Sequence, residues 1–159
     1  MTAETPRFIH LRVRTALSLL QSMIRPKDLA KWATSTGAPA VGVTDDNLFA
    51  ALELAESLTE AGVQSITGLT LDVIESGVTG EQGRLALLAQ NEAGYRNLMK
   101  LTSDAFLGTE PGLIPQVSLS NLAAHAEGLL ALTGGVAGEV GRHLLENRAD
   151  AARISLDRL

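Results

Sequence analysis

The chain has no cysteine, few aromatic residues and no long apolar run. Without cysteine it can form neither disulfides nor thiolate metal sites. Aromatic residues make up 3% of the 159 residues and hydrophobic residues 45%, so we expect a mainly aliphatic core. No apolar run approaches the roughly 18 residues needed to span a bilayer, and no signal peptide is visible. We therefore expect a cytoplasmic protein that does not contact membranes.

Clustered basic residues are also missing. The 13 Lys and Arg residues are outnumbered by 18 Asp and Glu residues, which gives a net charge of −5. Proteins that bind phosphate backbones do so through clusters of Lys and Arg, which release counterions. We therefore expect no independent binding of nucleic acid.

Strand-like and helix-like segments alternate from residue 8 onward. Pro26 and Gly37 are typical of the start and stop of a helix, and Asn91 of a helix cap. We expect strands over 8–14, 40–44, 64–73, 84–89 and 129–133. Helices are expected over 26–36, 48–58, 91–107, 118–126, 138–146 and 149–159, with a hairpin turn over 75–83. The repeated strand–helix–strand pattern predicts an α/β fold with a parallel sheet, either an open doubly wound sheet or an incomplete barrel.

In parallel α/β folds, functional side chains gather at the carboxyl ends of the strands. Here those ends carry Arg12 and Arg14, Asp45 and Asp46, Thr70 and Asp72, and Gly134 and Gly135. Two arginines facing aspartates favour a salt-bridged rim, in which Arg12 or Arg14 pairs with Asp45, Asp46 or Asp72. An anion site in a pocket between the arginines is the alternative.

Histidines are too few for a metal centre. His10 lies on the first expected strand, whereas His125 and His143 lie in helices without a second ligand nearby. Hydrolytic sites with two or three metals need several converging His and carboxylate side chains. We expect no metal ligands and no catalytic residues, and we place the histidines at the surface or the core edge. Residues 134–138 are expected to form a close-packed turn and not a phosphate loop.

Four short motifs occur in order between residues 7 and 146. Residues 8–14 read F-I-H-L-R-V-R and are followed by Ser18-Leu19-Leu20, while residues 39–49 contain P-A-V-G-V-T-D and N-L-F. Residues 87–98 contain L-L-A-Q-N and G-Y-R-N-L, and residues 127–135 read E-G-L-L-A-L-T-G-G. Together they resemble the PHP (polymerase and histidinol phosphatase) domain of bacterial DNA polymerase III alpha subunits. The resemblance implies the N-terminal portion of a distorted (β/α)7 barrel, the PHP fold.

The departures from the family pattern fall on its metal ligands. Where the family has the two histidines of its first H-x-H motif, this chain has Arg12 and Arg14. The other expected ligand positions are Gln21 for an Asp, Asp46 for a His and Thr70 for a Glu; a looser alignment adds Arg84 for a His and Gly135 for a Cys. The resemblance therefore implies a vestigial metal site.

The resemblance also implies a role. From it we expect a non-catalytic scaffold that docks the proofreading exonuclease subunit. The chain would be one part of a DNA-directed DNA polymerase and would contact the rest of that polymerase. No cofactor is expected here, and Mg²⁺ is expected only at the polymerase's palm domain. A metal-dependent phosphoesterase, either a 3′→5′ exonuclease or a pyrophosphatase, is the alternative, and a stand-alone binding module is a third.

The ends of the chain carry further expectations. Residues 1–6 are expected to be flexible, and residues 1–159 to form one PHP domain. The final helix reaches Leu159 without a cap, which predicts truncation at the C-terminal side. An unpaired sheet edge and an apolar helix face would then favour self-association.

Overall fold

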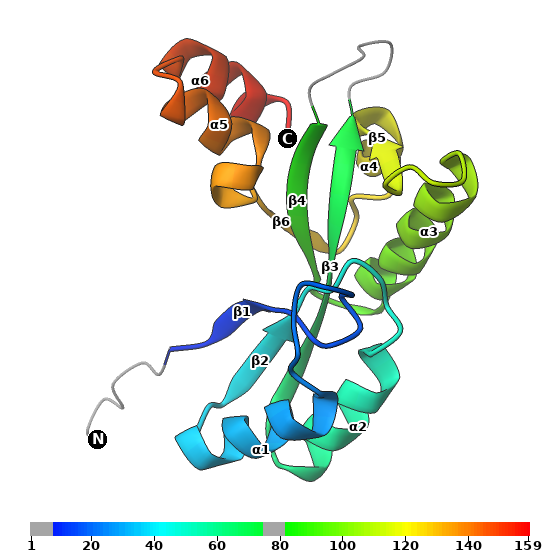
Figure 1. Ribbon diagram of the computed structural model, residues 1–159, viewed down its shortest axis with the longest axis vertical. Coiled ribbons are helices and arrows are strands. Elements are labelled where there is room, and N and C mark those ends of the chain that lie inside the picture. Colours follow the sequence, from blue (N-terminus) through cyan, green and yellow to red (C-terminus); the bar gives the residue numbers. More distant parts are fainter. Residues whose placement is uncertain (1–7, 75–81) are drawn as a thin grey trace. The chain divides into compact units, whose positions relative to one another are not determined.

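The computed structural model describes residues 8–74 and 82–159 (Figure 1). The chain forms two compact units, residues 1–68 and 69–159. Strand β3 (Gln64–Ile74) contributes residues to both. The flexible segment expected at 1–6, and most of the turn expected at 75–83, lie outside the described residues.

In the first unit, strand–helix–strand steps build a parallel arrangement. Its elements are β1 (His10–Val13), α1 (Pro26–Thr36), β2 (Ala40–Val43), α2 (Ala51–Glu60) and the start of β3. Strand β2 pairs in parallel with β1 and with β3, with Ala40 opposite Gln64 and Val43 opposite Thr67. This part of the sheet confirms the predicted parallel order, because each helix carries the chain back between neighbouring strands.

Helix α1 begins and ends where the sequence predicts. Pro26 occupies the first turn, where its fixed φ suits a helix and its missing N–H is not needed. Gly37 ends the helix at φ 64°, in the left-handed region that favours glycine, and its N–H donates to Thr34 O at 3.1 Å.

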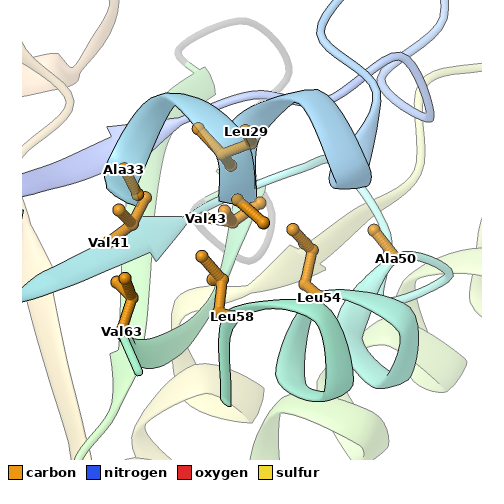
Figure 2. Packing of buried hydrophobic residues seen from close by; sticks show 9 residues of the cluster. Leu29, Ala33, Val41, Val43, Ala50, Leu54, Leu58 and Val63 are labelled. Carbon is orange, nitrogen blue, oxygen red and sulfur yellow. The ribbon is translucent and has the colours of Figure 1, made fainter. Parts of the chain in front are cut away.

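The core of the first unit is aliphatic, as the composition predicts. Figure 2 shows apolar side chains of α1, β2 and α2 pointing toward one another: Leu29, Ala33, Val41, Val43, Leu54 and Leu58. Leu58 is fully buried, and burying such a side chain is worth about 1.5–3 kcal/mol. This cluster fixes the two helices against β2 and thereby positions the loops that follow β1 and β2.

The second unit combines parallel and antiparallel pairings. After β3 come β4 (Gln82–Ala89), α3 (Glu92–Gly108), β5 (Gln116–Ser118), α4 (Leu119–Ala124), β6 (Leu129–Leu132), the 3₁₀ turn η1 (Gly135–Ala137), α5 (Glu139–Leu145) and α6 (Ala149–Asp157). Strand β5 pairs in parallel with β3, whereas β4 pairs antiparallel with β6. The fold is therefore mixed α/β with a parallel-rich sheet.

The prediction of a parallel sheet is wrong at β4, although the hairpin turn expected over 75–83 already implied a reversal there. Ala86 lies opposite Leu132 and Ala89 opposite Leu129 in an antiparallel ladder. A parallel crossover takes a dozen or more residues, and only residues 75–81 separate β3 from β4.

Two further elements differ from the prediction. Strand β5 was not expected. Helix α2 begins at Ala51, three residues later than predicted, because residues 46–50 form bends and turns.

The G-Y-R-N-L motif attaches α3 to the turn before β6. The side chain of Asn91 caps the helix by accepting from Gly94 N at 3.0 Å. Asn97 Nδ2 donates to Glu127 O at 2.9 Å. A Cβ at Gly94 would lie 2.0 Å from Gly128 O, so only glycine permits this close approach. The motif therefore has a structural role in this chain.

Candidate functional site

Asp45, directly after β2, is a buried carboxylate with three hydrogen bonds. Its Oδ1 accepts from Thr15 N at 2.7 Å and from Ser18 Oγ at 2.6 Å. Its Oδ2 accepts from Thr15 Oγ1 at 2.6 Å. Only 1% of the residue is exposed, and a buried carboxylate requires such partners to offset its lost hydration. Asp45 therefore fastens the segment after β1 to the end of β2.

Arg14, Gln21 and Asp46 form a closed ring of side chains. Arg14 Nη1 lies 3.0 Å from Asp46 Oδ1 and also donates to Gln21 Oε1. The amide of Gln21 completes the ring by donating to Asp46 Oδ2. The Arg14 side chain is 17% exposed and that of Asp46 31%. The side chains at three of the expected ligand positions thus bind one another. We call these three residues the Arg14 ring.

Residues 15–25, which we call the strap, connect β1 to α1 and carry Gln21. Ala16 N donates to Ile24 O at 2.8 Å, which closes the strap on itself. Ser22 Oγ donates to Arg14 O at 2.8 Å, and Asn47 Nδ2 donates to Leu17 O at 3.0 Å. These bonds, with those of Asp45, hold the strap in one conformation.

The other residues expected at the site have different surroundings. Arg12 is exposed on β1 and is not a member of the Arg14 ring. Thr70 is buried on β3 and belongs to the second unit. Asp72, also in the second unit, is bound by Arg84 of β4, with Nε 3.3 Å from Oδ1 and Nη2 2.9 Å from Oδ2. Asp45, which was expected to face an arginine, is bound by hydroxyls and a backbone N–H.

The three histidines are dispersed. The ring of His10 makes edge contacts with Phe8 and Trp32, at centroid distances of 4.7 and 5.2 Å. His125 Nδ1 lies 3.0 Å from Asn121 O. His143 is more buried than expected, at 4% exposed, because α5 packs against α6. Within residues 8–74 and 82–159, no three His, Asp or Glu side chains are grouped so that they could hold a metal ion.

Glu139 links α5 to α6. Its Oε1 accepts from Ser155 Oγ at 2.9 Å and from Arg158 Nη2 at 2.7 Å, and it lies 3.5 Å from His143 Nε2. These contacts explain why the side chains of Ser155 and His143 can be buried. Sequence reasoning missed this cluster because its members lie on two separate helices, α5 and α6, whose packing against each other the sequence does not show.

The Gly134–Gly135 turn is close-packed, as the sequence predicts. Both residues have positive φ, 78° and 60°. A Cβ at Gly134 would lie 1.8 Å from Arg84 O. The glycines therefore allow β6 to turn tightly beside β4.

The residues of the Arg14 ring do not fit a divalent metal ion. Such ions take carboxylate, carbonyl or imidazole ligands, and a guanidinium group has no lone pair to offer. Both oxygens of Asp46, the one carboxylate of the ring, are already engaged by Arg14 and Gln21. The arrangement is suited to holding the strap, β1 and β2 together without a metal.

None of the described helices has the length and apolar composition that crossing a membrane requires.

The family model of the PHP domain matches residues 10–159. The DNA polymerase III subunit alpha of Caulobacter vibrioides is 44% identical over 144 residues, which are 87% of this chain and 13% of that protein. The same subunit of Vibrio cholerae is 36% identical over 142 residues, 89% of this chain and 12% of that protein. This chain thus spans only about an eighth of the length of these relatives.

Among solved structures, an amidohydrolase from Chromobacterium violaceum has a TM-score of 0.49 and 16% identity, over 63% of this chain and 34% of that one. The match of the family model over residues 10–159 identifies the chain. It belongs to the PHP domain family, and its similarity to these relatives is that of a PHP domain from a DNA polymerase III alpha subunit.

Proposed function

We propose that this chain is a non-catalytic PHP domain that acts as a scaffold in a replicative DNA polymerase and docks the proofreading exonuclease subunit. The Arg14 ring is the observation that carries the proposal. It joins three positions that the family resemblance assigns to metal ligands. Their side chains here bind one another, and a guanidinium group stands where a metal ligand would be needed.

Electrostatics supports a scaffold that works without metal. Two like unit charges 4 Å apart repel by about 4 kcal/mol at an effective dielectric constant of 20, and a divalent cation doubles this. Arg14 therefore opposes a metal ion at this position. In the ring, Arg14 attracts Asp46 at 3.0 Å, so an ion pair provides the link between strand ends that a metal would provide elsewhere.

The wider role follows from the relatives. Their name supports DNA-templated DNA synthesis as the activity of the whole protein. We propose that the Mg²⁺ of this reaction is bound in a palm domain outside this chain. The rest of the alpha subunit would then be the first partner of this domain, in the cytoplasm. The parallel first unit is compatible with part of a (β/α)7 barrel.

Metal analysis of the purified protein is the decisive experiment. Protein incubated with Zn²⁺ or Mn²⁺ and then desalted should hold no stoichiometric metal and should not hydrolyse bis-p-nitrophenyl phosphate. The variant Arg12→His/Arg14→His/Gln21→Asp/Asp46→His rebuilds the family's ligand types and serves as a comparison in the same assay. Stoichiometric metal in the unaltered protein, lost in Asp46→Asn, would overturn the proposal in favour of a metal-dependent phosphoesterase.

The docking role needs a separate test. The exonuclease subunit of the same organism, mixed with the full alpha subunit, should co-elute with it in size-exclusion chromatography. An alpha subunit lacking residues 1–159 should lose this co-elution while the remaining chain stays soluble. Unchanged co-elution of the deleted form would show that the exonuclease docks elsewhere.

A further inference from the structure

The first unit has an open apolar groove between β1, the strap and α1. Its volume is about 460 Å³, and its lining is mostly apolar: His10, Val13, Met23, Ile24, Asp28, Leu29 and Trp32. Met23 is 93% exposed, Ile24 43% and Trp32 39%. Large apolar side chains that gather in an exposed groove are typical of an interaction site, whereas isolated ones are ordinary.

The strap presents this apolar surface in a fixed and strained conformation. Leu20 has φ 62°, which is unfavourable for a residue with a branched side chain. Its side chain is nevertheless fully exposed, and its neighbour Leu19 is 77% exposed. Strain of this kind persists only where surrounding contacts impose it. Here the hydrogen bonds of Asp45 and of the Arg14 ring do so.

The segment that supplies the groove is basic in a chain that is acidic as a whole, and the acidic residue in the lining, Asp28, is paired with Arg25. Residues 8–44 contain five basic residues, Arg12, Arg14, Arg25, Lys27 and Lys31, and one acidic residue, Asp28. Two of these charges are neutralised, since Arg14 pairs with Asp46 at 3.0 Å and Arg25 with Asp28 at 2.8 Å.

Two lysines keep their charge at the surface. Lys27 and Lys31 are exposed on α1, the helix that carries Trp32. In the part of the chain that the structure describes, neither forms an ion pair. By contrast, α2 carries Glu53, Glu56 and Glu60 and no basic residue.

We infer that this groove docks an acidic, amphipathic segment of a partner protein. Apolar side chains of the segment enter between Met23 and Trp32, and its carboxylates face Lys27 and Lys31. The inference rests on the proposed docking role and adds the place and the chemistry of the partner. It gives the Arg14 ring an indirect role in docking, because the ring holds the strap that supplies Met23.

Two other classes of ligand fit the groove less well. A small molecule is usually enclosed over most of its surface, whereas this groove is bordered by the almost fully exposed Met23. Single-stranded nucleic acid needs open aromatic faces for its bases. The ring of His10 stands edge-on to Trp32, with an interplanar angle of 72°, and much of the remaining lining is aliphatic.

Trp32 is the only tryptophan of the chain, so its fluorescence reports on the groove directly. The probe is a synthetic helical peptide with leucines on one face and glutamates on the other. Its counterpart carries lysines in place of the glutamates. Addition of the acidic peptide should shift the emission maximum of Trp32 to shorter wavelength, and the shift should reach saturation. The basic peptide should cause no such shift. Equal binding of both peptides, binding of neither, or a shift with a single-stranded oligonucleotide alone would overturn the inference.

Matched variants locate the effect. Met23→Glu places a repelling charge in the groove and should raise the Kd of the acidic peptide at least tenfold, about 1.4 kcal/mol. Lys27→Glu/Lys31→Glu should weaken binding and reduce its dependence on salt. Leu52→Glu is the control, because Leu52 is exposed to 71% on α2, away from the groove residues. An equal loss with Leu52→Glu would contradict the location.

The outcome is separable from that of the proposed function. If the acidic peptide fails to bind while the protein still holds no metal, the groove inference is wrong and the scaffold proposal is unaffected. If metal is found at the Arg14 ring while the peptide binds as expected, the docking inference stands and the non-catalytic role is wrong.

Discussion

Thr15 donates twice to Asp45, from its backbone N–H to Oδ1 at 2.7 Å and from its hydroxyl to Oδ2 at 2.6 Å. Both residues are almost completely buried. The pair joins the first residue of the strap to the end of β2, so one carboxylate holds the start of this loop in place.

Asp45→Asn should therefore strongly destabilise the protein. The amide keeps the volume but turns an acceptor into a donor that faces the hydroxyls. The loss of a charge-assisted hydrogen bond and one unsatisfied buried group together amount to about 3 kcal/mol. Unfolding in urea measures this loss as a decrease in the free energy of unfolding. Asp28→Asn, which breaks an exposed pair, should cost less than about 1 kcal/mol, and an equal cost for both would contradict this account.

The ion pair of the Arg14 ring should be worth more than a surface pair. Its side chains are 17% and 31% exposed, compared with 76% and 44% for Arg25 and Asp28. A double-mutant cycle of Arg14→Ala and Asp46→Ala should give a coupling energy of about 1 kcal/mol, whereas exposed helix pairs give about 0.3–0.5 kcal/mol. A coupling energy no larger than that of Arg25 and Asp28 would show that solvent screens the ring.

Local signals in the sequence were sufficient for most elements of the fold. Pro26, Gly37 and Asn91 act through their own backbone or side-chain chemistry, so the boundaries that they mark are reproduced within one residue. The hairpin turn expected over 75–83 implied a reversal before β4, but the antiparallel pairing of β4 with β6 was not predicted, because alternation of apolar residues is the same in parallel and antiparallel strands. The short spacing at 75–81 was the signal that favoured a reversal.

The candidate site was only partly predictable. Arg14 and Asp46 follow neighbouring strands, and a charge pair between such ends can be expected from sequence. The roles of Thr15 and Ser18 could not, since hydroxyl residues are common in loops and only the folded chain brings them to Asp45. The Asp72–Arg84 pair was missed because its cation lies on β4, whereas the expected partners were on β1.

Two glycines of α3 should respond in opposite ways to substitution by alanine. At Gly94 the added Cβ would lie 2.0 Å from Gly128 O, and at Gly108 it would meet nothing within 4 Å. Gly94→Ala should therefore lower the free energy of unfolding by several kcal/mol, because backbone must move. Gly108→Ala should raise it by up to about 1 kcal/mol through helix propensity. A mild effect at Gly94 would show that α3 can shift away from the 127–128 turn.

The pKa of Asp104 lies below its ordinary value, mainly because Lys100 Nζ donates to Oδ1 at 2.8 Å and secondarily because Asn121 Nδ2 donates to Oδ2 at 3.1 Å. A carboxyl group whose pKa is lower in the folded than in the unfolded state stabilises the fold above its unfolded pKa. That contribution is lost as the pH falls through the folded pKa. Lys100→Met should therefore move the pKa of Asp104 upward and flatten this acid-dependent loss.

Nuclear magnetic resonance titration of the Asp104 carboxyl carbon measures the shift directly. Asn121→Ala should raise the same pKa by a smaller amount, because an amide donates without a formal charge. Lys27→Met removes an equal charge from α1, in the other unit, and is the control. If Lys27→Met moved the Asp104 pKa as far as Lys100→Met, net charge and not the Lys100 hydrogen bond would be responsible.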